Sequence, residues 1–112
     1  MHEMSIAEGI LNIAFDYARQ NNSNKISKIT LKLGDMSGVE IEALNISFNI
    51  LTKDTIAEGA ELVINRIPII GKCNKCGKDF KITNYNFFCP ECEGILILQS
   101  GRELQVESLD LE

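Results

Sequence analysis

The four cysteines of this 112-residue chain have the spacing of a metal site. They form two Cys-x-x-Cys pairs, Cys73 with Cys76 and Cys89 with Cys92, separated by residues 77–88. A Cys-x-x-Cys turn directs two sulfurs at one point, and two such turns complete the tetrahedron of thiolates that Zn²⁺ accepts, with Zn–S distances of ~2.3 Å. The spacing therefore predicts one structural zinc ion bound by all four cysteines.

Three other uses of these cysteines agree less well with the sequence. Two disulfides would need an oxidising compartment, and no secretory segment is visible. A redox-active Cys-x-x-Cys usually occurs once, at the start of a helix, whereas here the motif occurs twice in a stretch punctuated by glycine and lysine. A rubredoxin-like iron site uses similar turns, but we expect more aromatic residues and a longer gap there. Zinc is therefore the favoured metal.

The only histidine, His2, lies at the amino terminus between Met1 and Glu3. On the simpler interpretation, a lone exposed histidine near a terminus has no role. On the alternative, the Met1 amine, the His2 amide nitrogen and the His2 imidazole Nδ1 close fused five- and six-membered chelate rings on one ion, and Glu3 supplies a fourth donor. Nitrogen donors held in a plane suit Ni(II) or Cu(II) rather than zinc. A bulky second residue protects the initiator methionine, so we expect the chain to begin at Met1.

Charge and composition narrow the class of protein. The chain has 11 basic and 16 acidic side chains, for a net charge of −5, which disfavours a role based on neutralising phosphates. A local basic patch nevertheless surrounds the first cysteine pair, formed by Lys72, Lys75, Lys78 and Lys81. No apolar run approaches the ~20 residues of a membrane span. We therefore expect a soluble cytoplasmic protein that contacts neither membrane nor nucleic acid.

The elements that must position these residues begin with a predicted helix at Ser5. Ser5 and Glu8 have the spacing of a capping box, in which each side chain satisfies a backbone amide of the first turn. Apolar residues follow at helical intervals and predict one broad buried face, made of Ile6, Ile10, Ile13 and Tyr17 with Leu11, Ala14 and Ala18 beside them. Residues 21–24 end this helix.

A strand and a second helix come next. From residue 25 to Gly34, apolar and polar residues alternate, which is the pattern of a strand with one face in water. Ser37 and Glu40 then have capping-box spacing and predict a helix start. The buried face of this second helix is predicted to contain Ile41, Leu44, Phe48 and Leu51.

Two further strands are predicted, over residues 60–67 and 103–111. Pro68 ends the first of them, because proline cannot donate a hydrogen bond to a neighbouring strand. In the last strand Leu104 and Val106 are at even-numbered positions, while Leu109 and Leu111 are at odd-numbered ones, so the two pairs would lie on opposite faces of a regular strand. Either a bulge near Glu107 resets the register, or both faces of this strand are apolar.

This order of elements predicts an α+β fold of two helices packed on a small three-stranded sheet, with an inserted zinc-ribbon-like lobe. The predicted domains are residues 1–69 with 99–112, which would bind nickel, and residues 70–98, which would bind zinc. The lobe is too short to hold much core, so zinc binding would supply its folding free energy, on the order of 10 kcal/mol.

The Met1-His2-Glu3 start, the Ser-Ile-Ala segment and the paired cysteines together resemble the HypA/HybF family of hydrogenase-maturation nickel metallochaperones. The similarity extends over the whole chain, including the strand from Lys25 to Gly34, Leu44 and Phe48, and the Gln-Ser-Gly stretch at residues 99–101. It implies a carrier, not an enzyme. Such a carrier takes Ni(II) at Met1, His2 and Glu3, holds structural zinc at Cys73, Cys76, Cys89 and Cys92, works with a nickel-handling GTPase, and serves the large subunit of a [NiFe]-hydrogenase.

Two details of the resemblance concern individual residues. Some relatives have an acidic residue near the nickel at the position of Glu40, although the predicted capping box already gives Glu40 a structural role here. Certain relatives also have histidines beside the zinc cysteines, whereas this chain has none there. A pH-dependent change of zinc ligands is therefore not expected.

Two other classes of function are compatible with the same residues. The first is a zinc-ribbon module that binds RNA or DNA through the four lysines of the basic patch, with Tyr85, Phe87 and Phe88 as its few stacking residues. The second is an adaptor whose zinc lobe serves only as a docking surface. Nickel titration distinguishes both from a metallochaperone. The sequence contains no evident pairing of catalytic acid and base.

Overall fold

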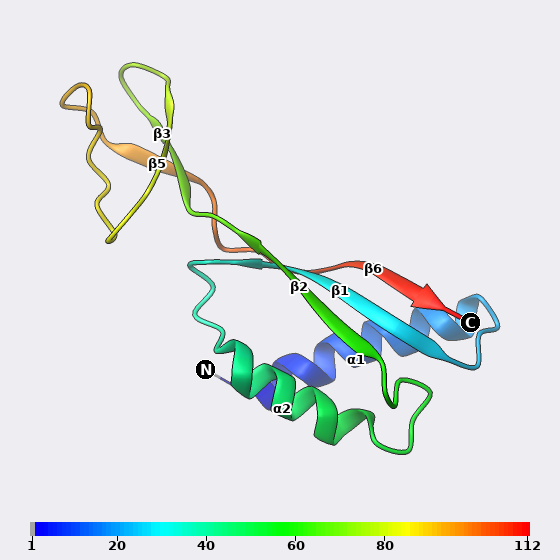
Figure 1. Cartoon of the computed structure of the whole chain (residues 1–112). Helices are drawn as coiled ribbons and strands as arrows, with labels where there is room; N and C mark the ends of the chain where they lie inside the picture. Colours follow the sequence, from blue (N-terminus) through cyan, green and yellow to red (C-terminus); the bar gives the residue numbers. More distant parts are fainter. Residues whose placement is uncertain (1) are drawn as a thin grey trace. The chain divides into compact units, whose positions relative to one another are not determined.

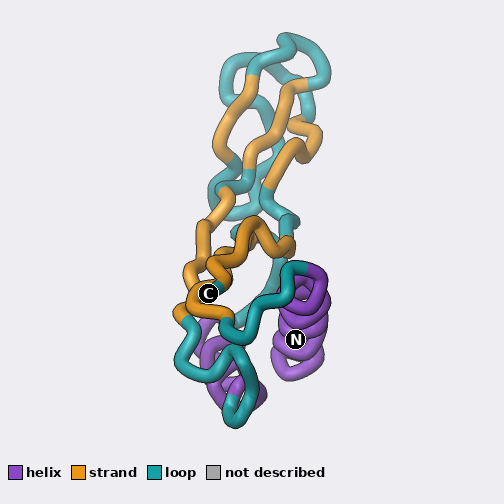
Figure 2. Tube along the Cα trace, turned by 90° about the vertical axis from the view of Figure 1, so that its right-hand side faces the viewer, coloured by secondary structure: helices purple, strands orange, loops and turns teal. Residues whose placement is uncertain are grey.

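The computed structural model describes residues 2–112 of the chain. Its elements are α1 (Glu3–Gln20), β1 (Ile26–Gly34), α2 (Ile41–Thr52), β2 (Glu61–Ile67), β3 (Ile70–Cys73), β4 (Asp79–Lys81), β5 (Leu96–Ser100) and β6 (Leu104–Leu111). The chain divides into two compact units, one with residues up to 31, 38–65 and 105–112, and one with residues 32–37 and 66–104. Both helices belong to the first unit, while the second contains only strands and loops (Figure 2).

Both helices cover one face of a three-stranded sheet with the strand order β2-β1-β6 (Figure 1). The central strand β1 contributes Ile26, Ile29 and Leu31 to the core, and Leu44 and Phe48 of α2 pack into the same cluster. The predicted α+β architecture is confirmed. No helix within residues 2–112 is long and apolar enough to cross a membrane.

Both predicted helix starts are wrong. Helix α1 begins at Glu3 with His2 as its N-cap, so Ser5 lies inside the helix and caps nothing. Helix α2 begins at Ile41, and its N-cap is Glu40, whose carboxylate accepts from the Glu42 amide at 3.3 Å. The predicted box from Ser37 fails because Gly38 has φ of +78°, a left-handed conformation that a right-handed helix cannot include.

The buried face of α1 is narrower than predicted. Its fully buried positions are Ala7, Ile10, Leu11, Ala14 and Ala18. The prediction that Ile13 and Tyr17 are buried is wrong, because these side chains are 55% and 54% exposed. Three of these five buried positions are alanines, and the larger apolar side chains at the border of this stripe stay in water.

Along strand β6, the positions whose side chains point to the core change from even-numbered to odd-numbered residues. Val106, Leu109 and Leu111 all pack against the same core, although Val106 has the opposite parity from the other two. Glu107 and Ser108 are both exposed and separate the two sets. Of the two predicted alternatives, this pattern favours a register change at Glu107, because apolar residues of both parities reach one core.

The second unit is built on the antiparallel sheet β4-β3-β5. Strand β3 pairs with both neighbours, placing Gly71 opposite Phe80 on one side and Cys73 opposite Leu96 on the other. Its core is small, and its fully buried members are Cys73, Ile82, Cys89 and Leu96. Two of these four are cysteines, so the core of this unit depends on the state of its sulfurs.

Candidate metal sites

The four cysteine sulfurs come together at one point. All four Sγ atoms lie within 4.8 Å of one another, with Cys73 and Cys92 at 3.4 Å and Cys76 and Cys89 at 3.8 Å. Zn–S bonds of about 2.3 Å in a tetrahedron place the sulfurs about 3.8 Å apart. A disulfide would need about 2.05 Å, and all four cysteines are free. The cluster therefore has the separation of a tetrathiolate metal site.

Backbone amides of the two Cys-x-x-Cys turns point at the sulfurs. The Lys75 and Cys76 amides donate to Cys73 Sγ, and the Glu91 amide donates to Cys89 Sγ, each at 3.4 Å. Such bonds orient thiolate ligands and disperse their negative charge. Tight turns at both cysteine pairs therefore let backbone amides face the thiolates.

Gly94 and Asn74 complete the support for the cluster. The Gly94 amide donates to Cys92 Sγ at 3.4 Å, and a Cβ at Gly94 would lie 2.5 Å from Cys73 Sγ, so only glycine allows this approach. Asn74 Oδ1 accepts from the Ile95 amide at 3.0 Å and links the first turn to the chain after the second. Sequence reasoning missed this role of Asn74, because its partner is distant in the chain.

The cysteines influence one another's ionisation. The amide of Cys76, with that of Lys75, lowers the pKa of Cys73 to about 6. The Gly94 amide also acts to lower the pKa of Cys92, but hydrogen bonds from Cys73 and the other sulfurs, together with desolvation, raise it to about 12. Once one thiolate has formed, its neighbours resist further charge. A divalent cation would allow all four to ionise, and a set of four thiolates in tetrahedral spacing fits structural zinc.

The residues of the predicted nickel site lie at the start of α1. Met1 lies outside the described residues. His2 is exposed, and its carbonyl accepts the first helical hydrogen bond, from the Ile6 amide at 3.1 Å. Glu3 follows as the first helical residue. The imidazole of His2 and the carboxylate of Glu3 thus belong to adjacent residues at one helix end.

Glu40 is brought to the same place by the tertiary structure. The Glu40 amide donates to Glu3 Oε2 at 3.2 Å, joining the N-termini of the two helices. This bond, more than any other contribution, lowers the pKa of Glu3. The side chain of Glu40 is meanwhile engaged in capping its own helix through Glu42. Glu40 therefore contacts the predicted nickel neighbourhood through its backbone.

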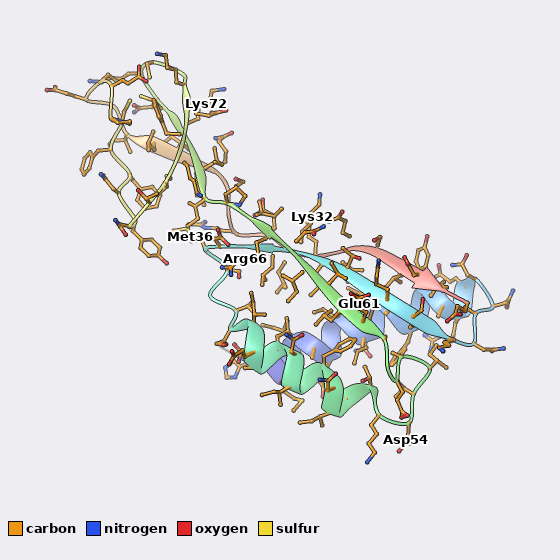
Figure 3. The ribbon with its side chains drawn as sticks, viewed as in Figure 1. Lys32, Met36, Asp54, Glu61, Arg66 and Lys72 are labelled. Carbon is orange, nitrogen blue, oxygen red and sulfur yellow. The ribbon has the colours of Figure 1, made fainter. Side chains whose placement is uncertain are left out.

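The basic patch on the second unit is partly neutralised. Its four lysines are exposed, and Lys72 projects from β3 (Figure 3). Lys78 Nζ lies 2.7 Å from Glu91 Oε1, and this ion pair raises the pKa of Lys78. Asp79 stands opposite Lys72 in the β3–β4 register. Acidic neighbours therefore weaken the attraction of this patch for phosphates.

The fold and the four-cysteine cluster define a small metal-binding α+β protein with a zinc-ribbon-like part. Residues 1–111 match the model of a protein family described as "Hydrogenase/urease nickel incorporation, metallochaperone, hypA". The chain therefore belongs to the HypA family of nickel metallochaperones for hydrogenase maturation, as the resemblance in its sequence predicted. This is a family of metal carriers and not of enzymes.

Relatives and solved structures agree with this assignment. The chain is 42% identical over 113 residues to hydrogenase maturation factor HypA of Chlorobaculum parvum, and 38% identical over 114 residues to that of Caldanaerobacter subterraneus subsp. tengcongensis, covering 100% of each chain. The solution structure of the Ni metallochaperone HypA from Helicobacter pylori matches with a TM-score of 0.69 at 21% identity, covering 99% of this chain and 97% of that one. A solution structure of another HypA protein matches with a TM-score of 0.75 at 22% identity, covering 100% and 97%. The structural matches establish the shared fold.

Proposed function

We propose that this protein binds Ni(II) at its amino terminus and, with a nickel-handling GTPase, delivers it to the large subunit of a [NiFe]-hydrogenase. The nickel donors are the Met1 amine, the His2 amide and imidazole, and Glu3. Zinc at Cys73, Cys76, Cys89 and Cys92 has a structural role. Family membership supports nickel as the cargo. The main observation in support of the amino-terminal site is that His2 is exposed and lies directly before α1.

The position of the chelate at a helix start has a physical advantage. The first N–H groups of an α-helix have no acceptor within the helix. The amides of His2 and Glu3 are among these groups, since within residues 2–112 the first helical bond is donated by Ile6. They can therefore lose a proton to a metal without breaking a helical hydrogen bond. Nickel loading and release would then leave α1 folded.

Glu3 and Glu40 have different parts in this proposal. Glu3 supplies a donor from its amide or its carboxylate. Glu40 acts on the site mainly by holding the Glu3 carboxylate with its backbone amide, at 3.2 Å, and its own carboxylate is a weak additional candidate. Glu40 can therefore influence the nickel site without binding the ion directly.

The GTPase is proposed to dock beside α1, because a metal passed between proteins stays ligated when the exchange distance is short. A groove of about 420 Å³ in the first unit supports this placement. It is lined by Ile13 and Tyr17 of α1 and by Val106 and Leu109 of β6. Exposed apolar side chains that border a groove are typical of protein–protein contact sites.

Each of the two predicted domains is proposed to bind one of the two metals. Residues 1–69 with 99–112 carry the nickel donors and the groove, and residues 70–98 carry the zinc ligands. The protein is proposed to act in the cytoplasm, where thiols remain reduced and available to zinc.

The decisive experiment blocks the terminal amine. We expect Ni(II) binding, measured by calorimetry and visible absorption, to be lost on acetylation, and mass spectrometry must first confirm that the free amine is on Met1. Adding a single residue is a poor test, because it moves the histidine to position three and builds a different chelate. An acetylated, folded protein that binds Ni(II) as tightly as the native one, with an unchanged spectrum, would show that the terminal chelate is wrong.

His2→Ala provides a second arm of the same test. It removes an imidazole that no other histidine of the chain can replace. We expect nickel binding to be lost while zinc content and helical circular dichroism are unchanged, so that both units are shown to be folded. Nickel retention by this variant would place the cargo site elsewhere.

A further inference from the structure

The loop after β4 holds a bulky side chain in a backbone conformation that favours glycine. Asn84 and Tyr85 have φ of +53° and +55°, and the Asn86 amide donates to the Thr83 carbonyl at 3.0 Å. Two consecutive positive φ values closed by such a bond are the pattern of a type I′ turn, in which Asn suits the first central position and Gly the second. Tyr85 therefore occupies the position at which glycine is the least strained residue.

Packing does not explain the choice of tyrosine at this position. The Tyr85 side chain is 66% exposed, so it buries little area in exchange for its strained backbone. A residue that contradicts a local rule without a compensating structural gain indicates a functional role. The feature that tyrosine offers at the tip of a turn is a rigid, amphipathic contact surface.

Further exposed apolar side chains lie next to this turn in the fold. Phe88 is 71% exposed and forms an isolated antiparallel bridge with Ile95, which is also exposed. Thr83 and Asn86, the two ends of the turn, line the same small cavity as Phe88. The turn and Phe88 thus border one continuous surface feature.

The size and charge of this cavity indicate what it accepts. Its volume is about 170 Å³, and an engineered cavity of about 150 Å³ admits benzene. Phe80 and Leu96 contribute apolar lining, and Lys81 is the one charged residue among the described residues that line it. The ion pairs found within residues 2–112 do not include Lys81. One apolar side chain flanked by a carboxylate would match this lining.

The metal site holds this surface in shape. Phe88 immediately precedes the ligand Cys89, and Ile95 immediately follows Gly94. The Cys89 amide donates to the Gly94 carbonyl at 3.0 Å, which closes the loop between Phe88 and Ile95. Binding of zinc by the second cysteine pair would therefore fix the spacing of the two exposed side chains.

We propose that Tyr85, Phe88 and Lys81 form a docking surface for an acidic, apolar segment of a partner protein. A nucleic acid would also suit aromatic residues and lysine. A nucleic acid is disfavoured because its successive phosphates need several cations, whereas Lys81 is the one charged residue among the described residues that line the cavity and Lys78 is already paired with Glu91. This surface lies in the cysteine unit and is additional to the nickel site and to the groove proposed for the GTPase.

The test uses the zinc-loaded full chain and a displayed library of random 12-residue peptides. We expect the native protein to enrich peptides that combine Asp or Glu with large apolar residues. For the best of these, fluorescence anisotropy should show a loss of affinity of about tenfold or more in Tyr85→Gly, the size of a hot-spot effect. Lys81→Glu should abolish binding of the same peptide.

The glycine variant separates binding from folding. Because glycine suits the turn better than tyrosine, Tyr85→Gly should retain zinc against a chelator at least as well as the native chain. Ile50→Ala, which truncates a large exposed apolar side chain in the first unit, is the control and should bind the selected peptide normally. Nickel binding should be unchanged in all three variants, so this test is independent of the terminal chelate.

Three outcomes would overturn the proposal. The first is the absence of enrichment, and the second is enrichment of basic peptides. The third is tight binding of a labelled single-stranded oligouridine that Tyr85→Gly and Lys81→Glu both abolish, because this would assign the surface to nucleic acid.

Discussion

The carboxylate of Glu3 accepts a hydrogen bond from the backbone amide of Glu40, with Oε2 and N separated by 3.2 Å. Glu3 is the first residue of α1, and Glu40 is the N-cap of α2. Their contact places the start of α2 beside Glu3, one of the predicted nickel donors. Carboxylates near helix N-termini are favoured by the free amides and by the helix dipole, so one carboxylate here serves both helix ends.

The Glu3 contact predicts a pH dependence of the junction between the helices. The Glu40 amide lowers the pKa of Glu3 in the folded protein, below the value of about 4.3 that a glutamate has in the unfolded chain. The folded state therefore favours the ionised carboxylate. The stability that this bond contributes is therefore fully present above that unfolded value and is lost as the pH falls through the lower folded pKa. NMR titration of the metal-free protein should show the Glu40 amide proton shifting with the ionisation of Glu3. An amide shift that is absent, or that is centred above 4.3, would contradict the contact.

Glu40→Gln separates the two possible roles of this residue. The substitution keeps the backbone amide that binds Glu3 and a side-chain oxygen that can accept from Glu42, but it removes the carboxylate charge. We expect the nickel affinity to change by no more than about twofold, since the direct contact with Glu3 is unaltered. Calorimetric titration of both proteins with Ni(II) measures this. A loss of tenfold or more, about 1.4 kcal/mol, would identify the Glu40 carboxylate as a nickel ligand.

Cys89→Ser should release the zinc and unfold the cysteine unit while leaving the helices largely intact. Structural zinc contributes on the order of 10 kcal/mol to the folding of small metal-dependent units, and the helices have a core of their own. Elemental analysis should find about one zinc per native chain and none in the variant, with helical circular dichroism nearly unchanged. Glu93→Ser, in the same loop but outside the cluster, is the control and should retain zinc. Collapse of the helical signal together with zinc loss would disprove the independence of the two units.

Substitution of the groove residues tests the docking of the GTPase. Ile13→Ser and Tyr17→Ser should each weaken its binding by about fivefold or more, as expected for exposed apolar anchors, and should change stability little because both side chains are mainly exposed. Ile46→Ser, an equally exposed isoleucine on α2, is the matched control. NMR shifts on adding the GTPase should follow the exposed residues of α1. Shifts confined to the lysines between Lys72 and Lys81 would move the docking surface to the cysteine unit.

The cysteine cluster could be predicted from the sequence because its geometry is mostly local. Each Cys-x-x-Cys turn aligns its own two sulfurs, and the spacing alone implies that the pairs converge. The two helices and the three strands of the first sheet were also predictable, since hydrophobic periods of 3.6 and 2 are properties of short segments. The short strands β3, β4 and β5 were not predicted. The division of β6 into two parities was visible for the same reason.

Tertiary structure decided the features that depend on distant residues. The Glu3–Glu40 bond joins positions 37 apart in the chain, and the link from Asn74 to Ile95 joins positions 21 apart. The sequence likewise did not determine that Ile13 and Tyr17 are exposed. Hydrophobic periodicity identifies the apolar face of a helix but does not show how much of that face the rest of the protein covers. Local patterns define elements and ligand turns, whereas helix ends, the edge of the core and contacts between segments depend on which backbone groups the fold brings within hydrogen-bonding distance.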